Sequence, residues 1–435
     1  MESHCRNICL FLLTLILSLG AASTYKPVIP VHHKEATILV KSPILFRFFP
    51  LANGHNTFTI FIIAEVQYDF LQFFEHDGQY RAHAQLEFTF SDAEHNQTFS
   101  RLVDIRAVTG VFDSTNLKTV YQTRVDSLTL PVGNYTVVVV YRDVNSGRTV
   151  KLNTQLALRY RAGRFYSNPL FCYPDTASSP LVPFCADGRP SALSDYWDFN
   201  RDARWVLHVW GISGQPQPLR ISVRHRENGK STLHIDTTVT PDPTFSTVSV
   251  ALPLSRLEEG AYDVVIDFPE TTPRIRFTVP LNIVWFTKPL SLWSLKTAIP
   301  PLKYILPQKE FEALQQGNRQ EQERRFRELW KARDPDPDTP YNAVLEEFYR
   351  RVDEANRRWS TRRRAGWETD RGKVFIVYGE PDDIVDRTLA PEPPQYLKWI
   401  YYRNGERIVA IFDAIEGRKI LKLRTIVTED NHDRQ

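Results

Sequence analysis

The sequence predicts a multidomain, mainly β protein: two tandem Ig-like antiparallel β-sandwiches followed by a C-terminal α+β domain of helices and a small antiparallel sheet. Three observations lead to this fold class. Short runs rich in Val, Ile, Phe, Tyr and Thr, punctuated by Gly, Asn and Asp, fill residues 35–290. Two of these runs carry the same turn-and-tyrosine pattern. Helical periodicity becomes clear only after residue 291.

The composition is that of a globular protein with room for several domains. The chain has 435 residues, of which 42% are hydrophobic and 24% are charged. Its formal net charge of +3 is too small to indicate a nucleic acid as the main partner. We therefore expect no nucleic-acid partner.

Residues 1–22 have the layout of a signal peptide. Arg6 precedes an apolar run from Ile8 to Leu19, and the small residues Gly20 and Ala22 suit a cleavage site. The run is short for a membrane span, so an uncleaved anchor is the weaker alternative. We expect an exported protein, periplasmic or extracellular, with no transmembrane segment in the mature chain.

Cys172 and Cys185 are the two cysteines that follow the signal, and they flank a Pro-containing loop. In an exported protein such a pair predicts a disulfide. A zinc site would need two further ligands at a suitable spacing, and none is near. We predict no metal and no cofactor.

The two sandwiches are predicted over residues 24–162 and 163–290. Each contains a Leu, a Gly three residues later, a Tyr two residues after that, and then an alternating apolar strand. The two copies are "LPVGNYTVVVVYRD" from Leu130 and "LEEGAYDVVIDFPE" from Leu257. This shared pattern is the reason for expecting two related domains.

The repeated Gly and Tyr residues have specific expected roles. Gly133 and Gly260 suit turns that need a positive φ. Tyr135 and Tyr262 are expected to enter the following strand pointing inward, as in the tyrosine corner of Ig-like sandwiches.

Residues 291–435 are predicted to form the α+β domain. Apolar side chains recur at spacings of three or four within Tyr341–Trp359, which predicts a helix with one apolar face. Thr339 is its expected N-cap and Pro340 its first residue. Asn404–Gly405, between two apolar runs, predicts a hairpin.

The stretch "GWETDRGKVFIVYGEPDDI", residues 366–384, is the most patterned in the chain. Gly366 is expected to cap the preceding helix in a left-handed conformation, and Trp367 to bury its ring. Thr369 and Asp370 can accept hydrogen bonds from turn amides, and Arg371 can pair with a carboxylate.

The second half of this stretch also has an expected structural role. Val374–Val377 is predicted to be a short buried strand, and Gly379 and Pro381 to shape the turn after it. We therefore interpret the whole stretch as a compact structural motif.

Two chemical alternatives remain for the acidic residues of this region. Asp370, Glu380, Asp382 and Asp383 could supply paired carboxylates for acid–base chemistry, with Arg371 as an electrophile. The run "DPDPDT" could hold calcium, but its sixth and twelfth positions lack the Gly and Glu of an EF-hand loop.

The C-terminal third resembles the GWxTD domain, a family found in exported bacterial proteins, over residues 300–425. The resemblance implies a setting in the cell envelope but no particular reaction. The motif residues that we expect to matter are Trp330, Asp334, Pro335, Thr339, Gly366, Trp367, Thr369, Asp370, Arg371, Gly372, Tyr378, Gly379, Pro381, Asp382 and Trp399.

The expected function is that of an exported, non-enzymatic envelope protein, a protein-interaction or scaffold component with a protein partner in the bacterial envelope. Arg362, Arg363 and Arg364 are its candidate interface residues, because arginine is enriched at interfaces and binds carboxylates bidentately. Alternatively, they merely solvate and cap a helix end. The alternative function is an envelope hydrolase acting on a glycan or peptide through a carboxylate site in the C-terminal domain.

Overall fold

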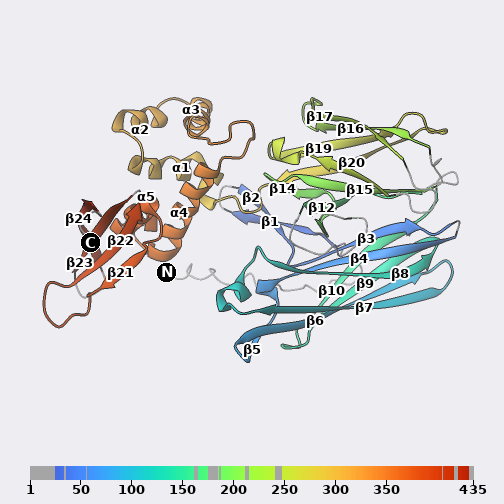
Figure 1. Cartoon of the computed structure of the whole chain (residues 1–435), viewed down its shortest axis with the longest axis horizontal. Helices are drawn as coiled ribbons and strands as arrows, with labels where there is room; N and C mark the ends of the chain where they lie inside the picture. Colours follow the sequence, from blue (N-terminus) through green and yellow to red (C-terminus); the bar gives the residue numbers. More distant parts are fainter. Residues whose placement is uncertain are drawn as a thin grey trace, which may run out of the picture.

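The computed structural model shows two stacked β-layered bodies and, beside them, a helical region with its own small sheet (Figure 1). The predicted signal peptide, residues 1–22, lies outside the described residues. The structure describes residues 25–33, 36–54, 56–160, 165–174, 185, 188–210, 215–240, 247–403, 405–415 and 420–430.

The first sandwich packs a three-stranded antiparallel sheet, ordered β3-β4-β8, against a five-stranded one. The larger sheet has the order β10-β9-β6-β5, with β7 also paired to β6. A hairpin of β1 and β2 precedes both. The strands are β1 (Val28–His33), β2 (Ala36–Lys41), β3 (Ile44–Ala52), β4 (Thr57–Gln67), β5 (Phe74–His76), β6 (Gln79–Asp92), β7 (Gln97–Thr109), β8 (Tyr121–Pro131), β9 (Gly133–Asp143) and β10 (Thr149–Leu158).

The second sandwich has two five-stranded sheets. One has the order β11-β15-β12-β13 with β18 also paired to β15, and the other has the order β14-β20-β19-β16-β17. Its strands are β11 (Phe165–Tyr166), β12 (Leu170–Pro174), β13 (Gly188–Pro190), β14 (Tyr196–Asp198), β15 (Ala203–Trp210), β16 (Gln217–His225), β17 (Ser231–Val239), β18 (Thr247–Leu252), β19 (Gly260–Phe268) and β20 (Ile275–Val284).

Both predicted tyrosine corners are present. Tyr135 is fully buried and its hydroxyl donates to the Pro131 carbonyl oxygen at 2.9 Å. Tyr262 is buried likewise, and its hydroxyl donates to the Glu258 carbonyl oxygen at 3.0 Å. Each bond reaches back four residues and ties the strand to the turn before it, so the repeated pattern marks a repeated structure.

The positive φ expected at Gly133 is wrong. Gly133 does not have a positive φ, whereas Gly260 has a φ of 157°. The absence of a side chain at Gly133 serves close packing instead, because a Cβ there would lie 2.4 Å from Asp92 Oδ2. The two corners therefore use their glycines for different reasons.

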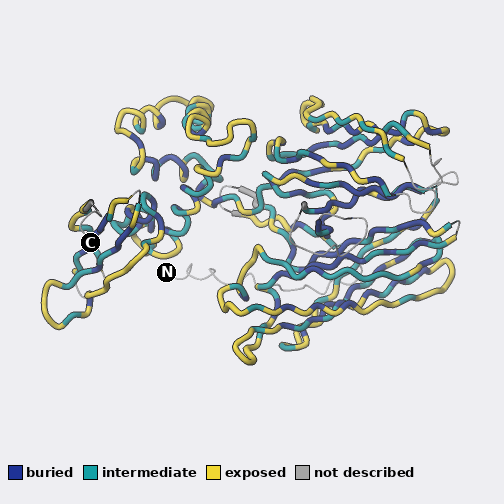
Figure 2. Tube along the Cα trace, in the orientation of Figure 1, coloured by how far each residue is buried: buried dark blue, intermediate teal, exposed yellow. Residues whose placement is uncertain are grey.

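The two sandwiches share a hydrophobic core. On strand β4, Phe58, Ile60 and Ile62 face the core of the first sandwich, while Ile63 belongs to a cluster that includes Leu170 and other residues of the second sandwich. Strands β3 and β4 of this sheet are thus buried on both faces. Figure 2 shows this burial along the strands at the joint.

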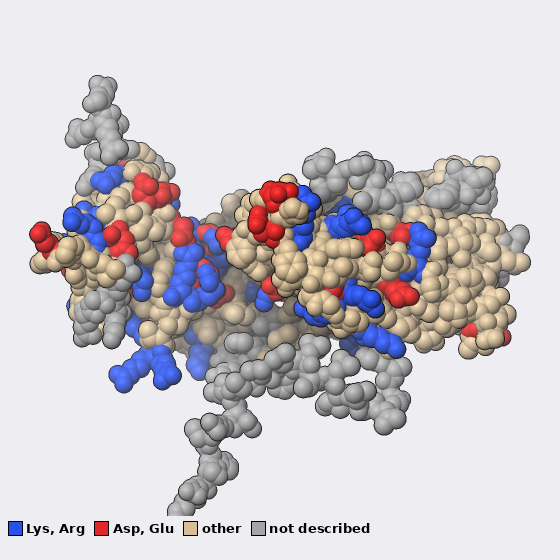
Figure 3. All heavy atoms as spheres, turned by 90° about the horizontal axis from the view of Figure 1, so that it is seen from below, with Lys and Arg blue, Asp and Glu red and all other residues tan. Residues whose placement is uncertain are grey.

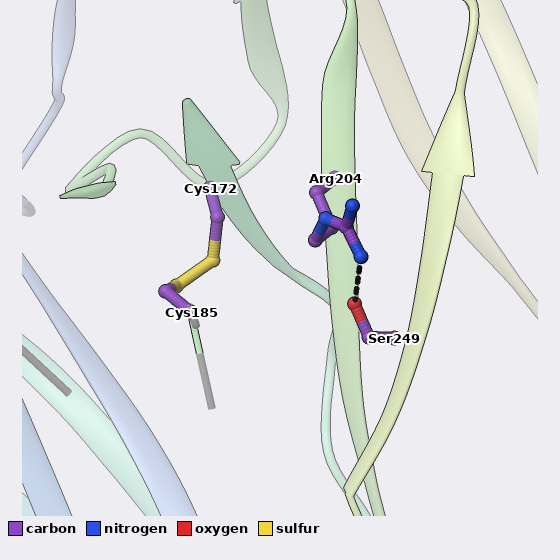
Figure 4. Close-up of a disulfide and its surroundings, with 4 residues drawn as sticks. All are labelled: Cys172, Cys185, Arg204 and Ser249. Carbon is purple, nitrogen blue, oxygen red and sulfur yellow. Dashed lines mark hydrogen bonds between the residues drawn. A yellow bond between two sulfur atoms is a disulfide. The ribbon is translucent and has the colours of Figure 1, made fainter. Parts of the chain in front are cut away.

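The predicted disulfide is present within this shared core. Cys172 and Cys185 are bonded, with their Cα atoms 6.0 Å apart, and both are buried. Cys172 lies on β12 beside Arg204 of β15, which donates to Ser249 Oγ of β18 at 3.5 Å (Figure 4).

The C-terminal region, residues 290–430, has a separate core formed by helices and one face of a four-stranded antiparallel sheet ordered β21-β22-β23-β24. The predicted hairpin joins β22 to β23, with Arg403 opposite Glu406. The elements are α1 (Leu295–Ala298), α2 (Gln308–Gln315), α3 (Arg319–Lys331), α4 (Ala343–Trp359), α5 (Asp370–Tyr378), β21 (Asp383–Asp386), β22 (Tyr396–Arg403), β23 (Glu406–Ile415) and β24 (Ile420–Asp430).

The predicted start of the long helix is wrong. Helix α4 begins at Ala343, with Asn342 rather than Thr339 as N-cap. Asn342 Oδ1 accepts from the Leu345 amide at 2.9 Å, and its Nδ2 donates to the Trp330 carbonyl oxygen at 2.7 Å. Because the amide side chain has both a donor and an acceptor, it can cap α4 and hold α3 at once. Pro340 therefore precedes the helix.

The strand predicted at Val374–Val377 is also wrong, because these residues lie in helix α5. A four-residue apolar run has no periodicity that separates a strand from a buried helix turn. The capping residues favour the helix. At the start of α5 the Thr369 hydroxyl accepts from the Gly372 amide, and at its end Gly379 has a φ of 84°.

Candidate functional site

The two glycines of residues 366–372 permit backbone contacts that no side chain would allow. A Cβ at Gly366 would lie 2.0 Å from the carbonyl oxygen of Ala355 on α4. A Cβ at Gly372 would lie 2.0 Å from the carbonyl oxygen of Gly366. Gly366 does not cap α4 as predicted, since α4 ends at Trp359 and Gly366 lies in a separate 3-10 helix. Its role is close packing of this 3-10 helix against α4.

Thr369 holds this packing in place with two hydrogen bonds. Its hydroxyl donates to the Gly366 carbonyl oxygen at 2.7 Å and accepts from the Gly372 amide at 3.0 Å. The Trp367 amide donates to Asn356 Oδ1 of α4 at 3.1 Å. These bonds satisfy backbone groups that the end of a short helix would otherwise leave unpaired.

The other side chains of the motif reach different elements. Asp370 Oδ2 accepts from the Leu423 amide of β24 at 2.9 Å. The half-buried Trp367 packs beside Tyr304, whose hydroxyl donates to the Trp367 carbonyl oxygen at 3.1 Å. Arg371 does not form the predicted fork with a described carboxylate; its guanidinium lies 5.6 Å from the ring centroid of Trp359. The motif therefore joins α4, α5, β24 and the segment before α2.

The turn after α5 is stabilised from two sides. Arg351 Nη1 donates to the Val377 carbonyl oxygen at 3.2 Å, and its guanidinium packs against Gly379. Tyr378 and the buried Tyr401 lie in ring contact, with centroids 5.4 Å apart. The Tyr401 hydroxyl donates to the Gly379 carbonyl oxygen at 3.3 Å.

Beyond this turn, the half-buried Pro381 leads to Asp382. Asp382 Oδ2 accepts from the Tyr402 amide at 2.7 Å and pairs with Arg403 at 2.7 Å. The hydrogen bond to Tyr402, together with Arg403, holds the pKa of the Asp382 carboxyl below its usual value. This carboxylate therefore ties the residue before β21 to the end of β22.

Of the carboxylates proposed for catalysis, Asp370 lies far from Asp382. Asp370 is anchored at Leu423 on β24, and Asp382 at Tyr402 on β22. Strand β23 lies between β22 and β24. In it, Phe412 is opposite Leu423 and Arg407 is opposite Tyr402, so the two pairing positions are five residues apart. At about 3.3 Å per residue, the offset along the strand alone is about 16 Å. Glycosidase carboxyl pairs lie within about 10 Å of each other, so these two cannot act on one bond.

The remaining acidic residues of the turn also have partners. Glu380 pairs with Arg358 at 2.8 Å, and Asp383 accepts from the Tyr402 hydroxyl at 3.3 Å. In the "DPDPDT" run, Asp334 Oδ1 accepts from the Asp336 amide at 3.0 Å, which shapes the loop. Among the described residues, potential metal ligands gather at Asp92, Glu94 and His95 rather than in this run.

A second group of motif residues meets in a cleft between the second sandwich and the helices. The cleft has a volume of about 620 Å³ and includes Trp330, Asp334 and Thr339 in its lining, together with Phe199 and Trp285 of the sandwich. Pro335 is exposed in the loop beside it. Trp399 lies elsewhere, buried between Trp359 and Phe412 in the core.

The arginines near the end of α4 divide into two sets. Arg357 and Arg358 both pair with Glu354 at 2.5 Å. Arg362, Arg363 and Arg364 are exposed in the segment that follows. Arg364 donates to the Glu368 carbonyl oxygen, whereas the guanidinium groups of Arg362 and Arg363 make no ion pair or hydrogen bond with the described residues. Figure 3 shows Lys and Arg side chains projecting from the part of the molecule at its left, where the C-terminal region lies.

Sequence reasoning did not predict the bridging roles of three residues that build the site. Asn342, Arg351 and Asn356 each bridge two elements through their side chains. Asn342 stands directly before an amphipathic run, which is a cap signal that could have been recognised. Nothing local marks the bridging roles of Arg351 and Asn356, because the Val377 carbonyl and the Trp367 amide lie 26 and 11 residues away.

None of the helices in the described ranges combines the length and the apolar character that crossing a bilayer requires. No curated protein matches the chain in sequence. Among solved structures, Escherichia coli alpha-2-macroglobulin activated by porcine elastase matches with 13% identity and a TM-score of 0.16. The match covers 56% of this chain and 22% of that one, so the chain spans about a fifth of that protein's length.

Residues 290–420 match the GWxTD domain family. The matched range contains the two close-packed glycines, the capping threonine and strands β21 to β23 of the sheet, and it ends just before Leu423, to which Asp370 bonds. The C-terminal third of this chain is a GWxTD domain.

Proposed function

We propose that the chain is an exported, non-enzymatic protein of the bacterial envelope, which binds a protein partner through the arginine segment 362–364 of its GWxTD domain. The disulfide supports an oxidising compartment, in agreement with the signal-peptide pattern of residues 1–22. The tandem sandwiches serve as a rigid support for the C-terminal domain.

The observation that carries this proposal is the division among the arginines. Arg357 and Arg358 are engaged with Glu354, which is the role expected of residues that merely finish a helix. Arg362 and Arg363 expose their guanidinium groups in an irregular segment where the described residues offer them no carboxylate. Free guanidinium groups bind carboxylates bidentately, so the partner should present an acidic surface.

The nearby motif supports binding rather than catalysis. Thr369, Asp370 and the Trp367 amide are occupied by hydrogen bonds within the fold. Asp370 and Asp382, the two motif carboxylates that a hydrolase could pair, are anchored at different places on the sheet. The motif therefore positions the arginine segment without itself contacting a substrate.

The test replaces Arg362, Arg363 and Arg364 with Gln in the full-length protein and measures crosslinking to envelope proteins of the native cell. A matched control replaces Arg319, Arg324 and Arg350, which are also exposed but pair with Glu residues of their own helices. Both variants lose three positive charges. The proposal expects one defined crosslinked species to be lost only in the first variant. Undiminished recovery with a folded first variant would show that the arginine interface is wrong.

A further inference from the structure

A cavity of about 520 Å³ lies at the joint between the two sandwiches, remote in sequence from the GWxTD domain. The first sandwich contributes the end of β2, part of β4 and the start of β8, and the second contributes residues of β12, β13 and β14. Its polar lining residues include Glu65, Tyr121, Tyr173, Arg189, Asp198 and Arg201. This size suits a small ligand.

Glu65 is the unusual residue of the cavity. It is only 4% exposed, and its Oε1 has no hydrogen-bond partner among the described residues. The nearest cation, Arg189 Nη1, is 3.7 Å from that oxygen, beyond a hydrogen bond. Burial raises the pKa of the Glu65 carboxyl, although the charges of Arg189 and Lys41 oppose this effect. A buried acceptor without a donor is costly, and a ligand that donates to it would remove the cost.

The cavity also has an excess of positive charge. Lys41 pairs with Asp198 at 2.8 Å, so that carboxylate is already engaged. Arg201 is 4.0 Å from the same carboxylate and its side chain is 61% exposed, which leaves it able to meet a ligand. Four cationic residues line the cavity against two acidic ones: Lys41, Arg124, Arg189 and Arg201 against Glu65 and Asp198.

The aromatic part of the lining is held in a fixed position. The ring of Tyr173 stacks on Trp197 at 4.5 Å between centroids, and the guanidinium groups of Arg189 and Arg201 lie 5.2 and 5.8 Å from its centre. The Tyr121 hydroxyl donates to the Ser42 carbonyl oxygen at 3.2 Å. Rigid aromatic side chains beside polar groups suit a ligand that has one apolar face and many hydroxyl groups.

We propose that this cavity binds a short acidic saccharide, with a sugar hydroxyl donating to Glu65 Oε1 and a uronate carboxylate facing Arg201. A saccharide supplies neutral donors for the buried carboxylate, a C–H face for the tyrosines and an anion for the excess cations. An apolar ligand or a simple anion would offer no hydrogen-bond donor to Glu65 Oε1.

The experiment titrates the full chain with digalacturonate and, in parallel, with the neutral disaccharide maltose, by isothermal titration calorimetry. Digalacturonate is expected to bind, and maltose to bind more weakly. Glu65→Leu removes the buried acceptor and is expected to abolish binding of both. Arg201→Gln should weaken digalacturonate at least about tenfold and leave maltose unchanged, because a hydrogen bond to a charged group is lost.

The matched control is Arg226→Gln, another exposed arginine of the second sandwich, which pairs with Asp263 at 3.0 Å. It should bind both sugars as the unchanged protein does. Because Arg201 is exposed, its variant tests the site even if Glu65→Leu disturbs the joint. Failure of digalacturonate to bind, equal weakening by Arg201→Gln and Arg226→Gln, or full binding by a folded Glu65→Leu variant would each overturn the proposal.

Discussion

Residues 366–372 and the arginines immediately before them use their polar groups in opposite ways. In the motif, Thr369 and Asp370 bond to backbone atoms of α5 and β24, and two glycines bring backbones into contact. Arg362 and Arg363 instead extend into solvent. The more patterned segment is thus the more structural one. The glycines and the threonine of residues 366–372 are required by close packing and capping. The guanidinium groups that are exposed to a partner belong to Arg362 and Arg363 in the preceding segment.

The comparison is most strongly tested by Gly366→Ala. Since the new methyl group would lie 2.0 Å from the Ala355 carbonyl oxygen, the 3-10 helix at residues 366–368 must move away from α4. We expect the C-terminal region to lose about 3 kcal/mol or more of its stability. Hydrogen–deuterium exchange of the full chain, followed peptide by peptide, measures this loss in residues 290–430.

The control for this substitution is Gly110→Ala, where an added Cβ meets nothing within 4 Å. It should change stability by less than about 1 kcal/mol. Equal protection of the C-terminal peptides in both variants would mean that close backbone packing is not why position 366 is glycine.

A smaller effect is expected from Thr369→Val, which keeps the shape of the side chain but removes both of its hydrogen bonds. The loss of this helix cap should cost about 1–2 kcal/mol. Thr369→Ser retains the hydroxyl and should restore most of the stability. The free energies of unfolding of the unchanged protein and the two variants are measured with denaturant. Equal stability of the Thr369→Val and Thr369→Ser variants would contradict the capping role of the hydroxyl.

A third prediction concerns the paired arginines. Hydrogen bonds from Arg357 and then Arg358 lower the pKa of Glu354 from its ordinary 4.5 to about 2. Because the folded-state pKa is the lower one, Glu354 stabilises the fold above about pH 4.5, and this contribution disappears as the pH falls towards 2. Glu354→Gln should remove about 1 kcal/mol of this acid-dependent stability. The free energies of unfolding of the unchanged protein and the Glu354→Gln variant are measured between pH 6 and pH 2. The same pH dependence in both proteins would contradict the pairing of Glu354 with the arginines.

The smallest effect on stability is expected for the joint change of Arg362, Arg363 and Arg364 to Gln. None of the three side chains makes an ion pair with a described residue, and only Arg364 donates a hydrogen bond, to the Glu368 carbonyl oxygen. Stability should therefore stay within about 0.5 kcal/mol of the unchanged protein. The melting temperature measures this directly. A large decrease in the melting temperature would mean that these arginines stabilise the fold as residues 366–372 do, and would contradict the difference drawn between the two segments.

The sequence predicted those features that depend on local pattern. Tyr135 and Tyr262 were found because the corner repeats at a fixed spacing, and the hairpin at residues 404–405 because its turn has a strong signal. The strand expected at Val374–Val377 failed because four apolar residues carry no period. There the helix is set by caps at Thr369 and Gly379.

The features that depend on distant contacts could not be predicted. The shared core of the sandwiches places Glu65 at a joint with Arg189, and these residues are far apart in the chain. One signal was present: "FTIFIIAEVQ" on β4 is apolar on consecutive positions, as a strand buried on both faces would be. The separation of Asp370 from Asp382 likewise follows from sheet order, which the sequence does not display.

The central claim is that the GWxTD motif builds the fold and does not perform chemistry. The direct measurement is turnover of a panel of glycan and peptide substrates by the purified protein, alongside Asp370→Asn and Asp382→Asn. In both variants the amide oxygen can still accept the hydrogen bond from Leu423 or Tyr402. The account predicts no turnover by any of the three proteins, with folding intact. Turnover by the unchanged protein that either substitution abolishes without unfolding would contradict it.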